Sequence, residues 1–579
     1  MKTKISIYQT FPRLFGNKNK NPKIGGSIKE NGVGKFNDYT SKALLTIRDL
    51  GITHIWYVGI IEHGTTTDYS KYDIAKDHPA LVKGKAGSPY AIKDYYDVNP
   101  DLAVDVKNRM TEFESLVQRT HEAGLKVIID IVANHIFRQY HSDVKPEGVE
   151  DFGQNDDTTK AFDPQNNFYY LPQTSFELPD GVLSNIAAIK TAYKPYIEVP
   201  ARITGNDVFA AKPDIEDWYE TAKLNYGVDL QGNGDKCFNP VPDTWKKMTD
   251  IMLFWASKGV DGFRCDMAEM IPVEFWNYAV NIVKKHYPDL IFIGETYNPL
   301  EYYNYINFGG FDFLYDKVGL YDTLKNIIIH NASTLSISNC WKVLEGLDAR
   351  MLRFIENHDE VRLASMAFAG DAKVAIPAMT LVATMNRGPV MIYGGQEVGE
   401  PAQGESGFSG DDGRTTIYDY FAMPEHQKWM NNGKFDGGGL SADQTLLRQF
   451  YQKILNFSLR YDAIANGEFY DLMWANPYGS LPQRNKIYIW LRHTSKQKLL
   501  FVISFDKSHD QQIRIKISDH AFNEMGWWKC CDFEAKELLW NMQKLQFDRK
   551  TAIETGLTID LRPNDALIFE IVPKDCREE

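Results

Sequence analysis

The chain has 579 residues, 43% hydrophobic and 24% charged, an ordinary globular composition that excludes a disordered or collagen-like protein and predicts two or three domains. Its 64 basic and 77 acidic residues give a formal net charge of −13, so we do not expect nucleic acid as a partner, since phosphate binding needs a basic surface. No apolar stretch reaches the roughly 20 residues that span a bilayer, and the N-terminus lacks the apolar region of a signal peptide. We therefore expect a cytoplasmic protein without membrane contact, and the sequence leaves its oligomeric state open.

A helix followed by a short apolar strand recurs along the first three quarters of the chain. A helix over 41–50 precedes a strand at 52–58, and a helix that opens on a capping box of Thr111 and Glu114 precedes a strand at 125–132. Six further strands are expected at 5–11, 260–266, 290–294, 311–316, 351–357 and 389–395. Eight apolar strands alternating with helices predict an α/β fold, a (β/α)8 TIM barrel, with a doubly wound open sheet as the alternative.

Two segments depart from this repeat. Residues 136–236 are rich in Asn, Asp, Pro and aromatics without a helical period, which predicts an inserted subdomain after the third strand. Residues 466–579 contain short alternating strands, which predict a C-terminal antiparallel β domain. The barrel is then formed by residues 1–135 and 237–465.

The cysteines show no C-x-x-C pair and no regular spacing. They are Cys237, Cys265, Cys340, Cys530, Cys531 and Cys576. This pattern favours neither a disulfide framework nor a zinc site. Cys265 lies inside an apolar strand, where it is expected to be a small core residue.

Polar residues follow several of the apolar strands. They are Asp130, Asn134 and His135 at the end of the third strand, Arg264 and Asp266 at the end of the fourth, Glu295 at the end of the fifth, and Asn357, His358 and Asp359 at the end of the seventh. Active residues of such barrels gather at the carboxyl ends of the strands. Any single residue of this set is explained by a helix cap or an ion pair. Burying all of them together costs desolvation energy unless a ligand or a reaction requires them.

Several kinds of chemistry use carboxylates and histidines of this type. A metal site is one alternative, with His135, Asp130, His358 and Asp359 as ligands, but no HExxH motif or dense His/Cys cluster supports it. A GxSxG elbow, a P-loop and a GxGxxG motif are absent from the sequence. Carboxylates with an arginine and two histidines suit the cleavage of a glycosidic bond.

Four motifs resemble, in order, the signature regions of the α-amylase family of glycoside hydrolases (glycoside hydrolase family 13). They are DIVANH (130–135), GFRCDMAE (262–269), GE (294–295) and ENHDEVR (356–362). LNY (224–226) is similar to the extra signature of the inserted domain, and SPYAIKDYYDVNP (88–100) to the stretch that supplies a sugar-stacking tyrosine.

The resemblance implies a role for each matching residue. Asp266 would be the nucleophile, Glu295 the general acid and then base, and Asp359 the residue that holds ring hydroxyls and stabilises the transition state. The residues implied to bind or orient substrate are Tyr90, which stacks on the sugar, His135 and His358, which hydrogen-bond it, Arg264, which keeps the nucleophile ionised, and Asp130, which orients the arginine.

Two positions depart from the family pattern. Many α-amylases carry Lys and His three and four residues after the nucleophile, where this chain has Glu269 and Met270. Since those residues of the family contact the departing side of the glucan, the acceptor side of the site departs here from the family pattern. Calcium is a candidate structural ion, with Asn134 and Asp156 as ligands, and the alternative is that Asn134 only hydrogen-bonds the insert.

The sequence thus predicts a retaining hydrolase that cleaves α-1,4-glucosidic bonds in starch-like glucans or maltooligosaccharides through a covalent glycosyl-enzyme intermediate. Within enzymes, the alternative is an α-glucan transglycosylase or an exo-acting α-glucosidase on the same scaffold. A non-catalytic glycan-binding protein is a further alternative, although such proteins typically lose the nucleophile or the acid.

Overall fold

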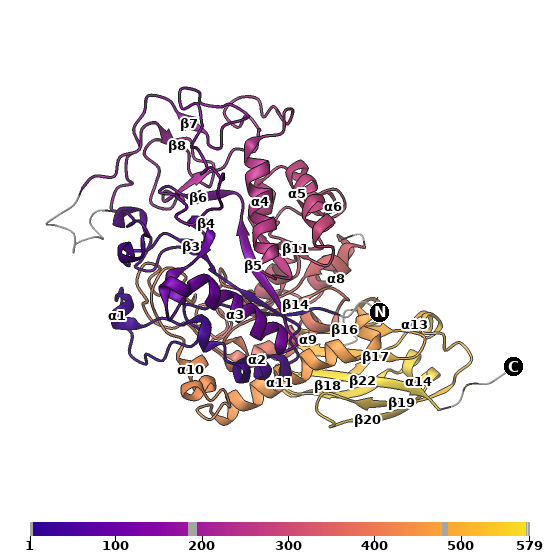
Figure 1. The fold of residues 1–579 in the computed structure, drawn as a ribbon. Coiled ribbons are helices and arrows are strands. Elements are labelled where there is room, and N and C mark those ends of the chain that lie inside the picture. Colours follow the sequence, from indigo (N-terminus) through magenta and orange to yellow (C-terminus); the bar gives the residue numbers. More distant parts are fainter. Residues whose placement is uncertain (1–3, 183–193, 345, 478–483, 575, 577–579) are drawn as a thin grey trace.

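Eight parallel strands form one sheet that curves into a barrel (Figure 1). The computed structural model describes residues 4–182, 194–344, 346–477, 484–574 and 576. The strands of the barrel are β1 (Ser6–Thr10), β2 (His54–Tyr57), β5 (Lys126–Val132), β10 (Gly262–Asp266), β11 (Ile291–Gly294), β12 (Phe313–Tyr315), β13 (Met351–Leu352) and β14 (Val390–Tyr393). Their order is β13-β12-β11-β10-β5-β2-β1-β14, and a parallel bridge between Arg353 and Val390 joins the two ends. The predicted (β/α)8 barrel is confirmed, and the open sheet is excluded.

Helices alternate with these strands along the chain. They are α2 (Ser41–Asp49), α3 (Arg109–Glu122), α4 (Asp243–Ser257), α5 (Val273–His286), α6 (Tyr302–Asn307), α7 (Asp322–His330), α8 (Ser336–Lys342), α9 (Ala375–Thr384) and α11 (Ala442–Arg460). In α4, buried side chains recur at helical spacing, among them Trp245, Met248, Met252 and Trp255. Burying each such side chain stabilises the fold by roughly 1.5–3 kcal/mol.

The start of α3 differs from the prediction. The helix begins at Arg109, because the 3₁₀ turn Val106–Asn108 runs directly into it. Thr111 therefore lies inside the first turn, where it cannot cap the helix, and the predicted capping box with Glu114 is wrong.

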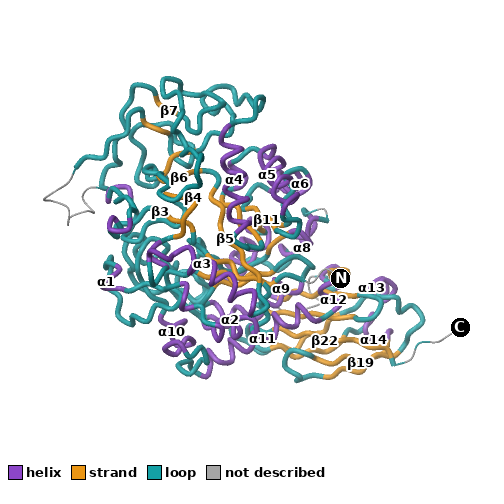
Figure 2. The backbone as a smooth tube through the Cα atoms, viewed as in Figure 1, coloured by secondary structure: helices purple, strands orange, loops and turns teal. Residues whose placement is uncertain are grey.

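The segment between β5 and α4 consists mostly of loops (Figure 2). Two short antiparallel pairs organise it: β6 (His135–Phe137) with β9 (Thr221–Lys223), and β7 (Tyr170–Leu171) with β8 (Ala201–Arg202). The inserted subdomain after the third strand is confirmed as an element of the fold. Its bounds, 136–236, stay a prediction, and residues 183–193 lie outside the described residues.

The C-terminal part of the chain is an antiparallel β domain beside the barrel (Figure 1). Its main sheet contains, in spatial order, β15 (Glu468–Asp471), β16 (Ile487–His493), β17 (Lys498–Ser504), β22 (Ala566–Pro573), β19 (Asp532–Glu537) and β20 (Lys544–Asp548), and a second sheet pairs β18 (Gln511–Ile515) with β21 (Leu557–Leu561). The domain is confirmed, whereas the bounds 466–579 and the barrel ranges 1–135 and 237–465 stay predictions. Throughout the described ranges, we find no helix that is both long enough and apolar enough to cross a bilayer.

One disulfide corrects the prediction from the cysteines. Cys530 and Cys576 pair, although 46 residues separate them. They meet because an antiparallel bridge joins their backbones, a contact that sequence spacing does not reveal. Cys265 is fully buried, as predicted. Disulfides are more usual in oxidising compartments than in the cytosol, and the cytoplasmic location stays a prediction.

The register of the barrel strands places charged side chains side by side. Arg264 of β10 lies opposite Asp130 of β5, and opposite Ile293 of β11 on its other side. Arg264 and Asp266 are two residues apart in a strand, so their side chains point to the same face. Glu295 directly follows the end of β11. The register therefore brings an arginine and three carboxylates to one end of the barrel.

Candidate active site

Arg264 is the centre of the charged cluster. Its Nη1 contacts Asp266 Oδ1 at 2.7 Å and Asp130 Oδ1 at 3.2 Å, and its Nη2 contacts Glu295 Oε2 at 2.7 Å. Its Nε donates to the Tyr315 hydroxyl at 3.2 Å. The Arg264 side chain is completely buried. One guanidinium thus holds three carboxylates from three neighbouring strand ends.

This cluster contains more acids than bases. Burial raises the pKa of Asp266 well above its ordinary value; Arg264 opposes the shift, and Glu295 and Asp130 add to it. Burial also raises the pKa of Asp130 to about 6, again against the effect of Arg264. Because buried like charges repel one another, such a site favours keeping a proton among its carboxyls. A cluster that holds one protonated and one ionised carboxyl is suited to acid–base and nucleophilic chemistry.

A second group of residues lies next to this cluster. His358 Nε2 is 3.1 Å from Asp359 Oδ2 and hydrogen-bonds the Tyr90 hydroxyl, and its Nδ1 is 2.7 Å from Gln9 Nε2. The rings of Tyr90 and His358 stack with their centroids 5.3 Å apart, and the Tyr90 ring centroid is 5.5 Å from the Arg264 guanidinium carbon. Burial and Arg264 lower the pKa of His358, which favours its neutral form. Asp359 is the most open of the four carboxylates, with 42% of its side chain exposed.

His135 joins the site through Tyr90 and the insert. It hydrogen-bonds the Tyr90 backbone, and its ring packs on Trp218 with the centroids 5.1 Å apart. Burial, with Lys223, lowers its pKa to about 3, so the imidazole is neutral. All eight residues predicted to react with or bind substrate therefore lie in one connected group.

Residues that the sequence analysis missed support this group. Trp56 Nε1 donates to Asp130 Oδ2 at 2.9 Å, and the Tyr297 hydroxyl donates to Glu295 Oε1 at 2.5 Å. Gln9 and Tyr315 contact His358 and Arg264, as described above. Three of these residues lie on barrel strands: Gln9, Trp56 and Tyr315. The fourth, Tyr297, lies two residues after Glu295. Their positions on or near the strands were the sequence signal that could have identified them.

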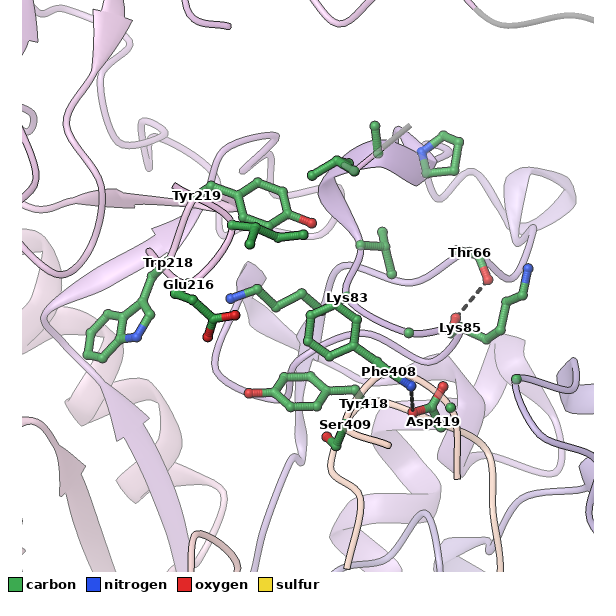
Figure 3. A pocket seen from close by; sticks show the side chains of 18 of the residues that line it. Thr66, Lys83, Lys85, Glu216, Trp218, Tyr219, Phe408, Ser409, Tyr418 and Asp419 are labelled. Carbon is green, nitrogen blue, oxygen red and sulfur yellow. Dashed lines mark hydrogen bonds between the residues drawn. The ribbon is translucent and has the colours of Figure 1, made fainter. Parts of the chain in front are cut away.

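A cavity of about 780 Å³ is lined in part by Trp218, whose ring packs on His135 (Figure 3). Its walls come from segments far apart in the sequence, among them Lys83 before β4 (Ile92–Val98), Trp218 and Tyr219 of the insert, and Phe408 and Tyr418 after β14. Figure 3 shows the Lys83 side chain between the Tyr219 ring and the rings of Phe408 and Tyr418. Trp218 links the cavity to His135. The size of the cavity and its mixture of aromatic and charged walls suit a polar ligand with flat apolar faces.

Known proteins resemble this chain in sequence and in fold. A family model described as alpha amylase, catalytic domain, matches residues 9–420. The chain is 24% identical over 458 residues to alpha-amylase 3 of Dictyoglomus thermophilum, with 75% of each protein covered. It is 22% identical over 531 residues to a cyclomaltodextrinase of Thermoanaerobacter pseudethanolicus, covering 87% of this chain and 72% of the relative. The solved structure of a maltogenic alpha-amylase from Thermotoga neapolitana has a similar fold, with a TM-score of 0.62 at 18% identity over 98% of each chain.

A lysine ammonium contacts the first predicted calcium ligand. Lys223 Nζ is 2.5 Å from Asn134 Oδ1, 3.2 Å from the Met270 carbonyl oxygen and 2.8 Å from Asp207 Oδ1. The Lys223 side chain is only 3% exposed. Carboxylate, amide and carbonyl oxygens are ligands that Ca²⁺ prefers, and here an ammonium group with three donors contacts them instead.

The second predicted ligand is also engaged by protein donors. Asp156 accepts hydrogen bonds from the backbone nitrogens of Asn167 (2.8 Å) and Phe168 (3.0 Å) and from the Tyr170 hydroxyl (2.9 Å). Within the part of the chain that the structure describes, no three His, Cys, Asp or Glu residues are grouped so that they could hold a metal. Asn134 and Asp156 therefore do not fit a calcium ion, because Lys223 already supplies the positive charge beside Asn134.

We predict that Lys223→Met destabilises the fold and that chelation of metals does not. Removing the ammonium leaves the oxygens of Asn134 and Asp207 without a positive partner, which should lower the free energy of unfolding by about 3 kcal/mol. Thermal unfolding of both proteins, measured with EDTA and with added CaCl₂, tests this. The melting temperature of the unsubstituted protein should not change with EDTA.

Lys236→Met is the matched control, since Lys236 is more than half exposed and pairs with Glu274 at the surface. It should change the stability by less than about 1 kcal/mol. A Lys223→Met protein as stable as this control, or a large loss of stability in EDTA, would contradict the interpretation.

Proposed function

We propose that this chain, which belongs to the α-amylase family, is a retaining glycosidase that hydrolyses α-1,4-glucosidic bonds in starch-like glucans or maltooligosaccharides. The observation that carries the proposal is the contact of both Asp266 and Glu295 with the Arg264 guanidinium, each at 2.7 Å. A retaining enzyme needs two carboxyl groups beside one glycosidic bond. The named relatives, an alpha-amylase and a cyclomaltodextrinase, support an α-glucan as the substrate class.

In the first step, Asp266 attacks the anomeric carbon, and the bond from that carbon to the glycosidic oxygen breaks. Glu295 gives its proton to the departing oxygen, which leaves as a sugar hydroxyl. Arg264 favours the ionised form of Asp266, because a fixed positive charge stabilises a neighbouring carboxylate. Asp359, the most exposed of the four carboxylates, would accept hydrogen bonds from ring hydroxyls and stabilise the positive charge that develops on the ring.

In the second step, a water molecule replaces the departed sugar. Glu295, now ionised, removes a proton from this water, and the resulting oxygen nucleophile attacks the anomeric carbon of the glycosyl-enzyme. The bond to Asp266 breaks, and Asp266 returns to its ionised form. Two inversions at the same carbon retain the α configuration in the product.

The surrounding residues would bind the sugar. Tyr90 offers an aromatic face next to His358, and the neutral imidazoles of His135 and His358 can donate hydrogen bonds to hydroxyls. Asp130 orients Arg264 through their 3.2 Å contact. The cavity lined by Trp218 and the loop after β14 would accept further glucosyl units.

We predict that Asp266→Asn lowers kcat/KM for maltoheptaose by roughly 10⁴-fold or more while binding is retained, because an amide cannot form the glycosyl-enzyme. Chromatography of the products measures turnover, and calorimetric titration with maltoheptaose measures binding. With the unsubstituted enzyme, products shorter than the substrate are expected. Longer products would indicate a transglycosylase, and glucose alone from the start would indicate an exo-acting α-glucosidase.

Asp289→Asn serves as the control, because Asp289 is exposed and precedes β11 at the opposite end of the barrel. Its activity should equal that of the unsubstituted enzyme. Unchanged turnover by Asp266→Asn would refute the assignment of Asp266 as the nucleophile, whereas binding without turnover by the unsubstituted protein would favour a protein that only binds glycans.

The raised pKa of Asp266 predicts the pH dependence of the reaction. Asp266 must be ionised to attack, so activity is lost as the pH falls through its pKa in the free enzyme. Since burial and the neighbouring acids raise that pKa, the acid limb of kcat/KM should lie above the ordinary aspartate value of about 4. Initial rates with maltoheptaose, measured from about pH 3 to about pH 9, test this prediction. A limb at or below pH 4 would contradict it.

A further inference from the structure

We propose that Tyr297, held in place by Glu269, is a positioning residue for the proton donor Glu295. This inference rests on the proposed function, because it assumes that Glu295 protonates the departing sugar oxygen. Glu269 lies shortly after β10, the strand that ends in the nucleophile, and Tyr297 lies shortly after β11, the strand that precedes the acid.

The two oxygens of Glu295 are held by different groups. Oε1 accepts a hydrogen bond from the Tyr297 hydroxyl at 2.5 Å. Oε2 accepts from the Met267 backbone nitrogen at 2.8 Å and contacts Arg264 Nη2 at 2.7 Å. Oε2 is thus held by Arg264 and by the backbone after β10, and the Tyr297 hydroxyl holds Oε1.

Glu269 fixes the backbone that carries Tyr297. Its Oε2 accepts hydrogen bonds from the backbone nitrogens of Tyr297 (2.8 Å) and Asn298 (2.9 Å). β11 ends at Gly294, before these two nitrogens, so within the described ranges the barrel sheet does not hold them. Glu269 lies on the short 3₁₀ turn Ala268–Met270 that follows β10. One carboxylate therefore ties the segment after the acid to the segment after the nucleophile.

A third contact strengthens this tie. The Tyr305 hydroxyl of α6 donates to the backbone oxygens of Glu269 (3.2 Å) and Ile271 (2.9 Å). The turn that carries Glu269 is thus itself anchored to the helix that follows the acid strand. Both ends of the connection from Glu269 through Tyr297 to Glu295 are fixed.

The physical reason for such a device is the flexibility of a glutamate side chain. A proton donor must lie within hydrogen-bond reach of the departing oxygen, and a displacement of about 1 Å can reduce the rate by about 100-fold. A tyrosine has two side-chain torsions and a rigid ring, so its hydroxyl is a well-defined anchor. Burial, with Glu295 and Asp359, raises the pKa of Tyr297, which keeps the hydroxyl protonated as a donor.

The proposal is tested with two substrates that differ in their need for a proton donor. Maltoheptaose has a sugar leaving group that must be protonated, whereas the fluoride of α-maltosyl fluoride departs without protonation. We expect Tyr297→Phe to lower kcat/KM for maltoheptaose by about 10- to 100-fold and to leave kcat/KM for α-maltosyl fluoride within about threefold. Because kcat/KM reports steps up to glycosyl-enzyme formation, the later role of Glu295 as a base does not enter.

Glu269 is tested with a conservative and a disruptive variant. Glu269→Ala should show the same selective loss as Tyr297→Phe. Glu269→Gln keeps a carbonyl oxygen that can accept both backbone hydrogen bonds, so it should restore most of the maltoheptaose activity. Turnover of the fluoride substrate also shows that each variant is folded.

Tyr303→Phe is the matched control, since Tyr303 lies on α6 in the same segment and 71% of it is exposed. It should leave both substrates unaffected. Equal losses on both substrates, or no loss on either, by Tyr297→Phe would overturn the proposal.

Glu295→Gln separates this proposal from the proposed function. If it abolishes cleavage of maltoheptaose but still releases a first equivalent of fluoride from α-maltosyl fluoride, which needs no proton donor, Glu295 is the proton donor and the Tyr297 result decides the inference alone. If Glu295→Gln leaves turnover of maltoheptaose intact, the assignment of Glu295 as the acid fails, and the positioning role fails with it.

Discussion

The contact of one buried guanidinium with three carboxylates is the constraint on which this structure depends. Arg264 is completely buried, and a buried charge is tolerated only when it is paired and hydrogen-bonded. Its partners come from β5, β10 and the end of β11, so they meet only when those three strands are in register. A slip of one residue in either pairing would move a carboxylate to the opposite face and leave the guanidinium unpaired. The register of the barrel strands therefore forms the site, and the ion pairs of the site in turn favour that register.

The excess of acids around Arg264 also links structure to chemistry. Glycoside cleavage by a retaining route needs an ionised and a protonated carboxyl beside each other. A buried cluster with more carboxylates than cations favours such a mixture, because full ionisation would place several like charges together in a medium of low polarity. The same arrangement is costly for stability, since burial opposes the ionisation of Asp266 and Asp130.

The insert and the loops complete the site through contacts between distant segments. Lys223 of β9 reaches Asn134 after β5 and Met270 after β10, and so joins the insert to two strand ends. The Lys223 ammonium belongs to the chain, so the positive charge beside Asn134 does not depend on a metal ion binding from solution. Glu269 has a comparable position after β10, where it accepts the backbone hydrogen bonds of the segment that carries Tyr297.

The sequence by itself determined the barrel and the residues at its strand ends. Eight apolar segments alternate with amphipathic helices, and burial on both faces of a parallel strand produces that local pattern. The position of Asp266 or Glu295 at the end of an apolar strand is equally local. Only the tertiary structure decided that the Lys223 ammonium lies beside Asn134, that Tyr297 hydrogen-bonds Glu295, and that Cys530 pairs with Cys576. These contacts depend on distances between segments or side chains that no local period or spacing encodes.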